Sequence, residues 1–75
     1  MSKYAEGTIV QHNEVEAVKY EFAPRDEYDD RPWRAVDAPP ILTYLAGDEN
    51  NEIRFADEDI NEGIECGELV VNHTP

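Results

Sequence analysis

Acidic side chains, gathered in three clusters, are the residues of this sequence whose types and spacing are best suited to chemistry. The clusters are Asp26, Glu27, Asp29 and Asp30; then Asp48, Glu49 and Glu52; then Asp57, Glu58, Asp59, Glu62, Glu65 and Glu68. Neighbouring carboxylates catalyse acid–base steps when burial or neighbours separate their pKa values. They also bind hard cations and attract basic proteins. Each kind of chemistry makes a different demand on the surrounding sequence.

Calcium binding is suggested by oxygen-bearing side chains that fall at ligand positions of an EF-hand loop: Asp57, Asp59, Asn61 and Glu68. That loop wraps a cation by a sharp turn at a central glycine. Here Glu62 occupies the glycine position, and Gly63 comes one residue late. Ile60 and Ile64 also have the spacing of one helix face. The pattern favours a surface helix with acids in its first turn, and calcium binding is the lesser alternative.

Catalysis is not indicated by the remaining reactive side chains. His12 lies in an expected turn and His73 in an expected tail. Cys66, the only cysteine, lies between Glu65 and Gly67, and nearby negative charge disfavours a reactive thiolate. The sequence has no phosphate-binding glycine loop and no serine nucleophile motif. We therefore expect a protein that is not an enzyme and that needs no cofactor or metal.

Net charge gives the strongest indication of function. The chain carries 18 acidic residues against 6 lysines and arginines, a net charge of -12 on 75 residues. Such charge costs a small fold stability through self-repulsion, yet it speeds association with a basic partner. Duplex DNA carries one charge per ~1.7 Å, and two acidic clusters on a body ~25 Å across approach that density. The profile is similar in composition to phage-encoded nucleic-acid mimics that inhibit restriction, repair or CRISPR nucleases.

The predicted function is therefore an acidic interaction protein that binds a basic partner, such as a DNA- or RNA-binding enzyme, as a nucleic-acid mimic. We expect Tyr28 and Trp33 to be partly buried anchors beside the first cluster. Changing the four acids of that cluster together should spare the fold, because they lie in a predicted loop. The predicted partner contacts are Asp26, Glu27, Tyr28, Asp29, Asp30, Trp33, Asp48, Glu49, Glu52, Asp57, Glu58 and Asp59.

The main alternative is a small domain of a halophilic organism, in which acidity serves solvation alone. A homodimer is a further expectation, because a chain this short buries little surface on folding. Direct nucleic-acid or membrane binding is not expected, since phosphates and anionic lipids repel acids. The longest apolar run, residues 41–46, is far shorter than the ~20 residues that span a bilayer. With no signal peptide and a single cysteine, the sequence favours the cytoplasm.

The elements that must position these residues are short. Alternation of apolar and polar residues predicts a hairpin of strands near 7–12 and 15–23. Residues 24–37 read as a loop, with 33–36 a short strand as the alternative. Asp37 and two prolines predict the start of a helix that ends near Gly47. Residues 52–56 alternate as a strand, and Asp57 is the expected N-cap of a helix ending within residues 63–67.

A closing strand at 68–72 and a frayed tail at 73–75 complete a single domain over residues 1–75. The predicted fold is α+β, a small antiparallel sheet of four or five short strands with one or two short helices. The alternative is a small β-barrel in which residues 41–46 form a strand. The predicted core consists of Ile9, Val18, Tyr20, Phe22, Leu42, Leu45, Ile53, Phe55, Ile60, Ile64, Leu69 and Val71.

Overall fold

The computed structural model describes residues 4–47 and 52–75, which form an α+β fold as predicted. Its described elements, in chain order, are β1 (Ile9–His12), β2 (Lys19–Phe22), β3 (Trp33–Val36), α1 (Pro40–Ala46), β4 (Arg54–Phe55), α2 (Asp57–Glu65) and β5 (Leu69–His73). The strands form one antiparallel sheet in the order β4-β3-β2-β1-β5. Because β4 and β5 are its two edges and do not pair, the sheet is open, and the β-barrel alternative is wrong.

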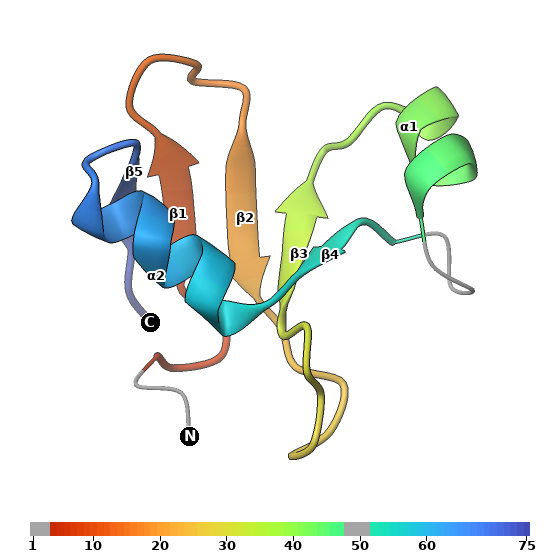
Figure 1. Cartoon of the computed structure of the whole chain (residues 1–75), viewed down its shortest axis with the longest axis horizontal. Coiled ribbons are helices and arrows are strands. Elements are labelled where there is room, and N and C mark those ends of the chain that lie inside the picture. Colours follow the sequence, from red (N-terminus) through yellow and green to blue (C-terminus); the bar gives the residue numbers. More distant parts are fainter. Residues whose placement is uncertain (1–3, 48–51) are drawn as a thin grey trace.

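Strand register decides which side chains face α2. Val10 pairs with Tyr20, and Phe22 pairs with Trp33. Directly opposed residues share a face of an antiparallel sheet, so these four side chains lie together. Helix α2 crosses that face and contacts β5, whereas α1 stands to one side of the sheet (Figure 1). The sheet is therefore covered by a helix on one face.

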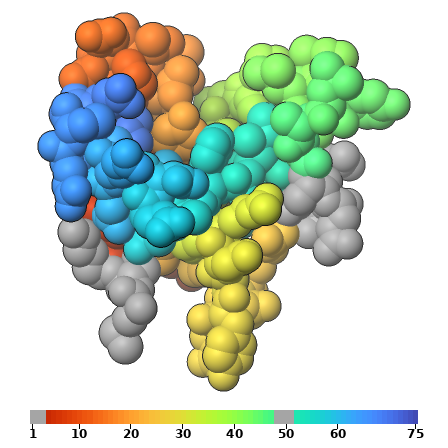
Figure 2. Space-filling model, in the orientation of Figure 1, coloured from red at the N-terminus to blue at the C-terminus, as the bar shows by residue number. Residues whose placement is uncertain are grey.

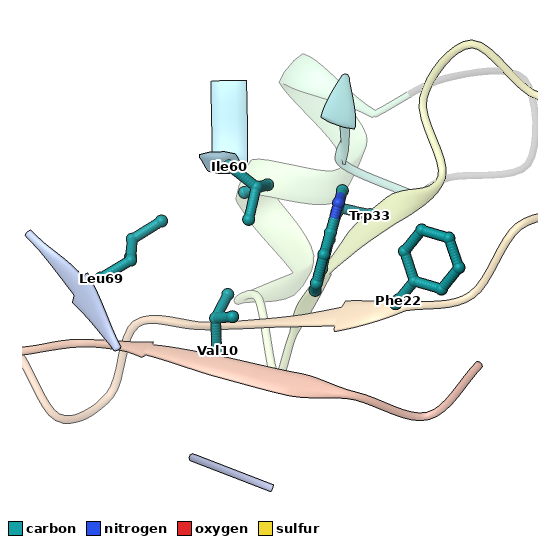
Figure 3. Packing of buried hydrophobic residues seen from close by; sticks show 5 residues of the cluster. All are labelled: Val10, Phe22, Trp33, Ile60 and Leu69. Atoms are coloured by element: carbon teal, nitrogen blue, oxygen red, sulfur yellow. The ribbon is translucent and has the colours of Figure 1, made fainter. Parts of the chain in front are cut away.

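The core lies between the sheet and α2. Its buried side chains come from three neighbouring strands, from α2 and from β5, and they converge in Figure 3: Val10, Phe22, Trp33, Ile60 and Leu69. Trp33 is 0% exposed and packs edge-on against Phe22, with ring centroids 5.1 Å apart. Tyr4 adds a second edge contact to Trp33 at 5.2 Å. Such aromatic pairs stabilise a core beyond the burial of their area.

The predicted core is confirmed in its centre and wrong at its margins. Phe22, Ile60 and Leu69 are buried, and Tyr20, Phe55 and Ile64 pack against them half-buried. Ile9, Val18 and Ile53 are half-buried outside this cluster.

Three further members of the predicted core are exposed: Leu42 (48%), Leu45 (70%) and Val71 (47%). Leu42 and Leu45 belong to α1, which has no buried residue, and Val71 lies on an edge strand. Val10 is buried instead of Ile9, because the register turns Val10 toward α2.

Several predicted boundaries shift. Residues 33–36 form β3, so the strand alternative is confirmed over the continuous loop. Helix α1 starts after Pro39, a neighbour of Asp37, and Asp37 itself has a left-handed backbone, φ 58°. The expected cap Asp57 is instead the first residue of α2, after Ala56. His73 is the last residue of β5 rather than part of a tail.

In residues 4–47 and 52–75, neither helix has the length or apolar character needed to cross a membrane.

Candidate functional site

An open cleft of about 550 Å³ brings together acids from two parts of the chain that are far apart in sequence. One wall is the loop that follows β2, and the other is the start of α2. Figure 2 shows this loop in yellow, projecting below the cyan start of α2. The lining residues are Tyr4, Phe22, Pro24, Asp26, Glu27, Asp29, Asp30, Pro32, Ala56, Asp57 and Glu58. Six of them are acidic, so two of the three clusters seen in the sequence share one acidic cleft.

Local turns give the loop its shape. The Asp26 side chain accepts a hydrogen bond from the backbone N–H of Tyr28 at 2.8 Å, and the Asp26 carbonyl accepts from Asp29 N–H at 3.3 Å. Aspartate commonly forms such turns, because its short side chain reaches the backbone two residues on. Pro32 is buried and leads directly into β3. The acids therefore project from a folded turn.

Arg54, on β4, ties this loop to the sheet. Its guanidinium donates to the carbonyls of Ala23 (2.5 Å) and Arg31 (2.8 Å), at the two ends of the loop. It also donates to the carboxylates of Asp29 (3.2 Å) and Glu52 (2.7 Å). The Arg54 and Asp29 side chains are each 2% exposed. We call this arrangement the Arg54 clamp, and it uses the rigid multi-donor fork that lysine lacks.

Asp29 is the acid at the centre of the clamp. Burial disfavours its charged form, but hydrogen bonds from the Arg25 side chain and from the backbone N–H groups of Arg25 and Arg31 outweigh burial. They hold the pKa of Asp29 well below its usual range. Asp29 is therefore a structural anion of the loop, and we correct the prediction that all four acids of its cluster can be changed without harming the fold.

Asp57 also has a structural role at the cleft. Its carboxylate accepts the indole N–H of Trp33 at 2.8 Å and the side-chain amide of Asn61 at 3.3 Å. The indole of a buried tryptophan needs such a partner. Asp57 and Glu58 also place negative charge in the first turn of α2, where the helix dipole favours it. The cleft wall and the core are thus joined through one hydrogen bond.

Asp26, Glu27, Asp30 and Glu58 remain as exposed acids around the cleft. Among the described residues, no lysine or arginine forms an ion pair with any of these four. A partner's guanidinium or ammonium group matches such a site, with Tyr4 and Phe22 supplying an apolar floor. In residues 4–47 and 52–75, no group of histidine, cysteine and acidic side chains is arranged to hold a metal ion.

The other predicted contact residues divide between exposed, buried and distant positions. Tyr28 is 85% exposed at the loop and remains a candidate anchor. Trp33 is fully buried, so its predicted role as a contact anchor is wrong. Glu52 is engaged by Arg54, and Asp59 lines a separate hollow of about 320 Å³ beside Tyr20. Asp48 and Glu49 lie outside the described residues.

The segment considered for calcium forms α2 followed by a turn. Its first acid, Asp57, is hydrogen-bonded to Trp33, and Gly63 packs against Leu69 as part of the core contact.

Sequence reasoning missed Arg54 and Tyr4 as residues that shape the cleft. An arginine within an alternating strand next to a carboxylate-rich loop was the available signal for Arg54. Tyr4 gave none, because its contacts to Asn61 and Trp33 are distant in sequence.

Comparison with protein-family models, with curated proteins and with solved structures finds no match to this chain.

Proposed function

We propose that this protein is an acidic interaction protein that binds a basic partner, a DNA- or RNA-binding protein, by presenting carboxylates in place of phosphates. The observation that carries this proposal is the convergence of two acidic segments on one cleft, with the loop fixed by a buried ion pair. A fixed array of charges favours association, because the partner need not order it on binding. The proposal includes a cytoplasmic location and no catalytic step.

The acids available to a partner are those that the fold does not use. Asp29 and Asp57 hold the structure, whereas Glu27, Asp30 and Glu58 are exposed on either side of the cleft. Charges at the rim of an interface act mainly on the rate of association and on its salt dependence. The proposal therefore predicts a kinetic effect from these three acids.

The test compares two variants with equal charge. The cleft variant is Glu27→Gln/Asp30→Asn/Glu58→Gln, and the control variant is Glu14→Gln/Glu16→Gln/Glu65→Gln, at exposed acids outside the cleft. Each removes three charges and changes the net charge from -12 to -9. Partners are captured from host lysate, eluted in a salt gradient and then measured one by one against the wild type and both variants.

We expect the cleft variant to associate more slowly, with a flatter salt dependence, and the control variant to bind almost as the wild type does. Duplex nucleic acid should compete with the chain for the captured partner. Equal losses in both variants would show that bulk charge alone drives capture. Capture that nucleic acid cannot displace would contradict mimicry.

Solvation in a halophilic organism is the second candidate, favoured by the spread of exposed acids beyond the cleft. Glu14 and Glu16 lie on the β1–β2 connection, and Glu62 and Glu65 lie on the exposed side of α2. Under this alternative no single set of acids is special. The two variants would then bind alike, and both would shift the salt dependence of unfolding alike.

A further inference from the structure

Helix α1 exposes an apolar surface that no described element covers. None of its residues is buried, and Ile41, Leu42, Tyr44 and Leu45 are 60%, 48%, 80% and 70% exposed. Figure 2 shows α1 in green, standing clear of the orange β1–β2 hairpin with a hollow between them. Four large apolar side chains that are adjacent on a short helix are unusual on a monomer surface, and such patches mark interaction sites.

Helix α1 is also too short to be stable by its own propensity. It has 7 residues, and isolated helices of such length are marginal in water. Its stretch, residues 38–47, is the longest run without a charged residue in a chain of net charge -12. A partner that packs against the apolar side of α1 would therefore stabilise this helix. Because the stretch carries no charge, two acidic molecules repel each other least where their α1 helices approach.

The face of the sheet opposite α2 offers a complementary surface. The register places Gln11 against Lys19 and Lys19 against Val36 on that face, with Ile9 against Glu21 and Glu21 against Arg34. These side chains are half-exposed. Arg34 is paired with Glu21 on this face, which leaves Lys19, within the described part of the chain, as the cation of these three residues without an ion pair. Arg54 lies opposite Arg34 in the register, but its guanidinium is held by Asp29 and Glu52. Lys19 therefore offers an attractive contact to a carboxylate of a second acidic copy.

We propose that two copies of this chain associate by reciprocal docking, in which α1 of each copy packs on the open sheet face of the other. Asp37, exposed just before α1, then approaches Lys19 or Arg34 of the second copy. A single contact along α1, about 10 Å long, buries too little for a stable dimer, which needs roughly 1,200 Å². A twofold axis repeats the contact and doubles the area. The acidic cleft, on the other side of the sheet, stays accessible in both copies.

The first test is sedimentation velocity on the chain alone, from micromolar to millimolar concentration. We expect a monomer–dimer equilibrium that tightens as NaCl rises from about 0.1 to 1 M, because the screening length falls from about 10 to 3 Å and the repulsion between two -12 bodies fades. Binding to a basic partner weakens over the same range, so the two proposals fail independently. A wild type that stays monomeric throughout would overturn reciprocal docking.

The second test uses two variants. Leu42→Ser/Leu45→Ser removes apolar surface from α1, and Lys19→Gln/Val36→Gln changes the sheet face. Val15→Ser, at a residue 48% exposed outside both surfaces, is the control for the first, and Arg31→Gln is the charge control for the second. Circular dichroism verifies the fold of each. We expect each double variant to raise the dimer Kd at least tenfold, a change of about 1.4 kcal/mol, and the controls to leave it unchanged.

Mixing the two double variants decides between modes of association. Reciprocal docking retains one intact contact in the mixture, whereas both contacts are damaged when either variant pairs with itself. The heterodimer should therefore have a Kd above that of the wild-type dimer and below that of either variant's homodimer. If the sheet variant dimerises alone with the wild-type Kd, the contact is between two α1 helices and the proposal is wrong. If both variants dimerise alone with the wild-type Kd, association runs through another surface, such as the edge of β5, and the proposal is wrong as well.

Discussion

Removal of the Arg54 guanidinium tests the clamp directly. In Arg54→Met the clamp loses four hydrogen bonds, three to the loop at Ala23, Asp29 and Arg31 and one to the Glu52 carboxylate. Asp29, 2% exposed, keeps Arg25 but loses its buried cation. The matched control is Arg34→Met. Arg34 lies directly opposite Arg54 in the register of β3 and β4. It forms an ion pair with Glu21, in which the Arg34 side chain is 37% exposed and the Glu21 side chain 27%.

The magnitudes differ clearly. Removing one partner of a buried ion pair costs about 3–5 kcal/mol, whereas an exposed pair contributes about 0–1 kcal/mol. A chain of 75 residues has a free energy of unfolding of roughly 4–11 kcal/mol. Arg54→Met should therefore remove a large share of the stability and lower Tm by at least about 12 °C, and Arg34→Met by less than about 8 °C.

The assay is urea and thermal unfolding, followed by circular dichroism in molar NaCl so that the destabilised variant remains folded. Arg54→Lys keeps the charge without the fork and should fall between the wild type and Arg54→Met. In a double-mutant cycle with Asp29→Asn, the two losses should be less than additive, because both changes break the same contact. Equal Tm losses for Arg54→Met and Arg34→Met, or additive losses in the cycle, would refute a clamp.

Three other outcomes are expected. Folding lowers the pKa of Asp29, so the contribution of Asp29 to stability is complete above the ordinary aspartate pKa of ~4 and is lost as the pH falls below it. The free energy of unfolding of Asp29→Asn should therefore fall less on acidification than that of the wild type. Stability of the wild type should rise with added salt, which screens the repulsion among 18 acids, and a melting midpoint that stays flat or falls would show that they are already paired. Gly63→Ala should cost about 1–3 kcal/mol in urea unfolding, because the new Cβ would lie 2.6 Å from Leu69 Cδ1, and an unchanged midpoint would mean that Leu69 moves freely.

The local spacing of apolar residues predicted the helices and strands well. Alternation around Val18, Tyr20 and Phe22 predicted the position of β2, and the spacing of Ile60 and Ile64 predicted the side of α2 that faces the core. Periodicity failed where apolar residues are not buried. Ile41 and Leu45 have helical spacing, and α1 is helical, but only tertiary packing decides whether such a stripe faces a core.

The cleft was predictable only in part. Its acids were visible as clusters, but their meeting depends on the order of the sheet, which places the loop after β2 beside the start of α2. Trp33 was predicted to be a partly buried anchor because it lies beside the first acidic cluster in the sequence. Its burial depends on pairing with Phe22 and on the Asp57 carboxylate, 24 residues further on. Contacts at such separation leave no local pattern.

The hydrogen bond between Trp33 and Asp57 gives the molecule its own optical signal. Trp33 is the only tryptophan of the chain, so its fluorescence arises from one site. Its indole N–H donates a hydrogen bond to the carboxylate of Asp57, which lines the cleft. Its ring also packs against Tyr4, another lining residue. A cationic group that draws the Asp57 charge away from the indole alters the emission without any label. Occupancy of the cleft can thus be titrated by light in the unmodified protein.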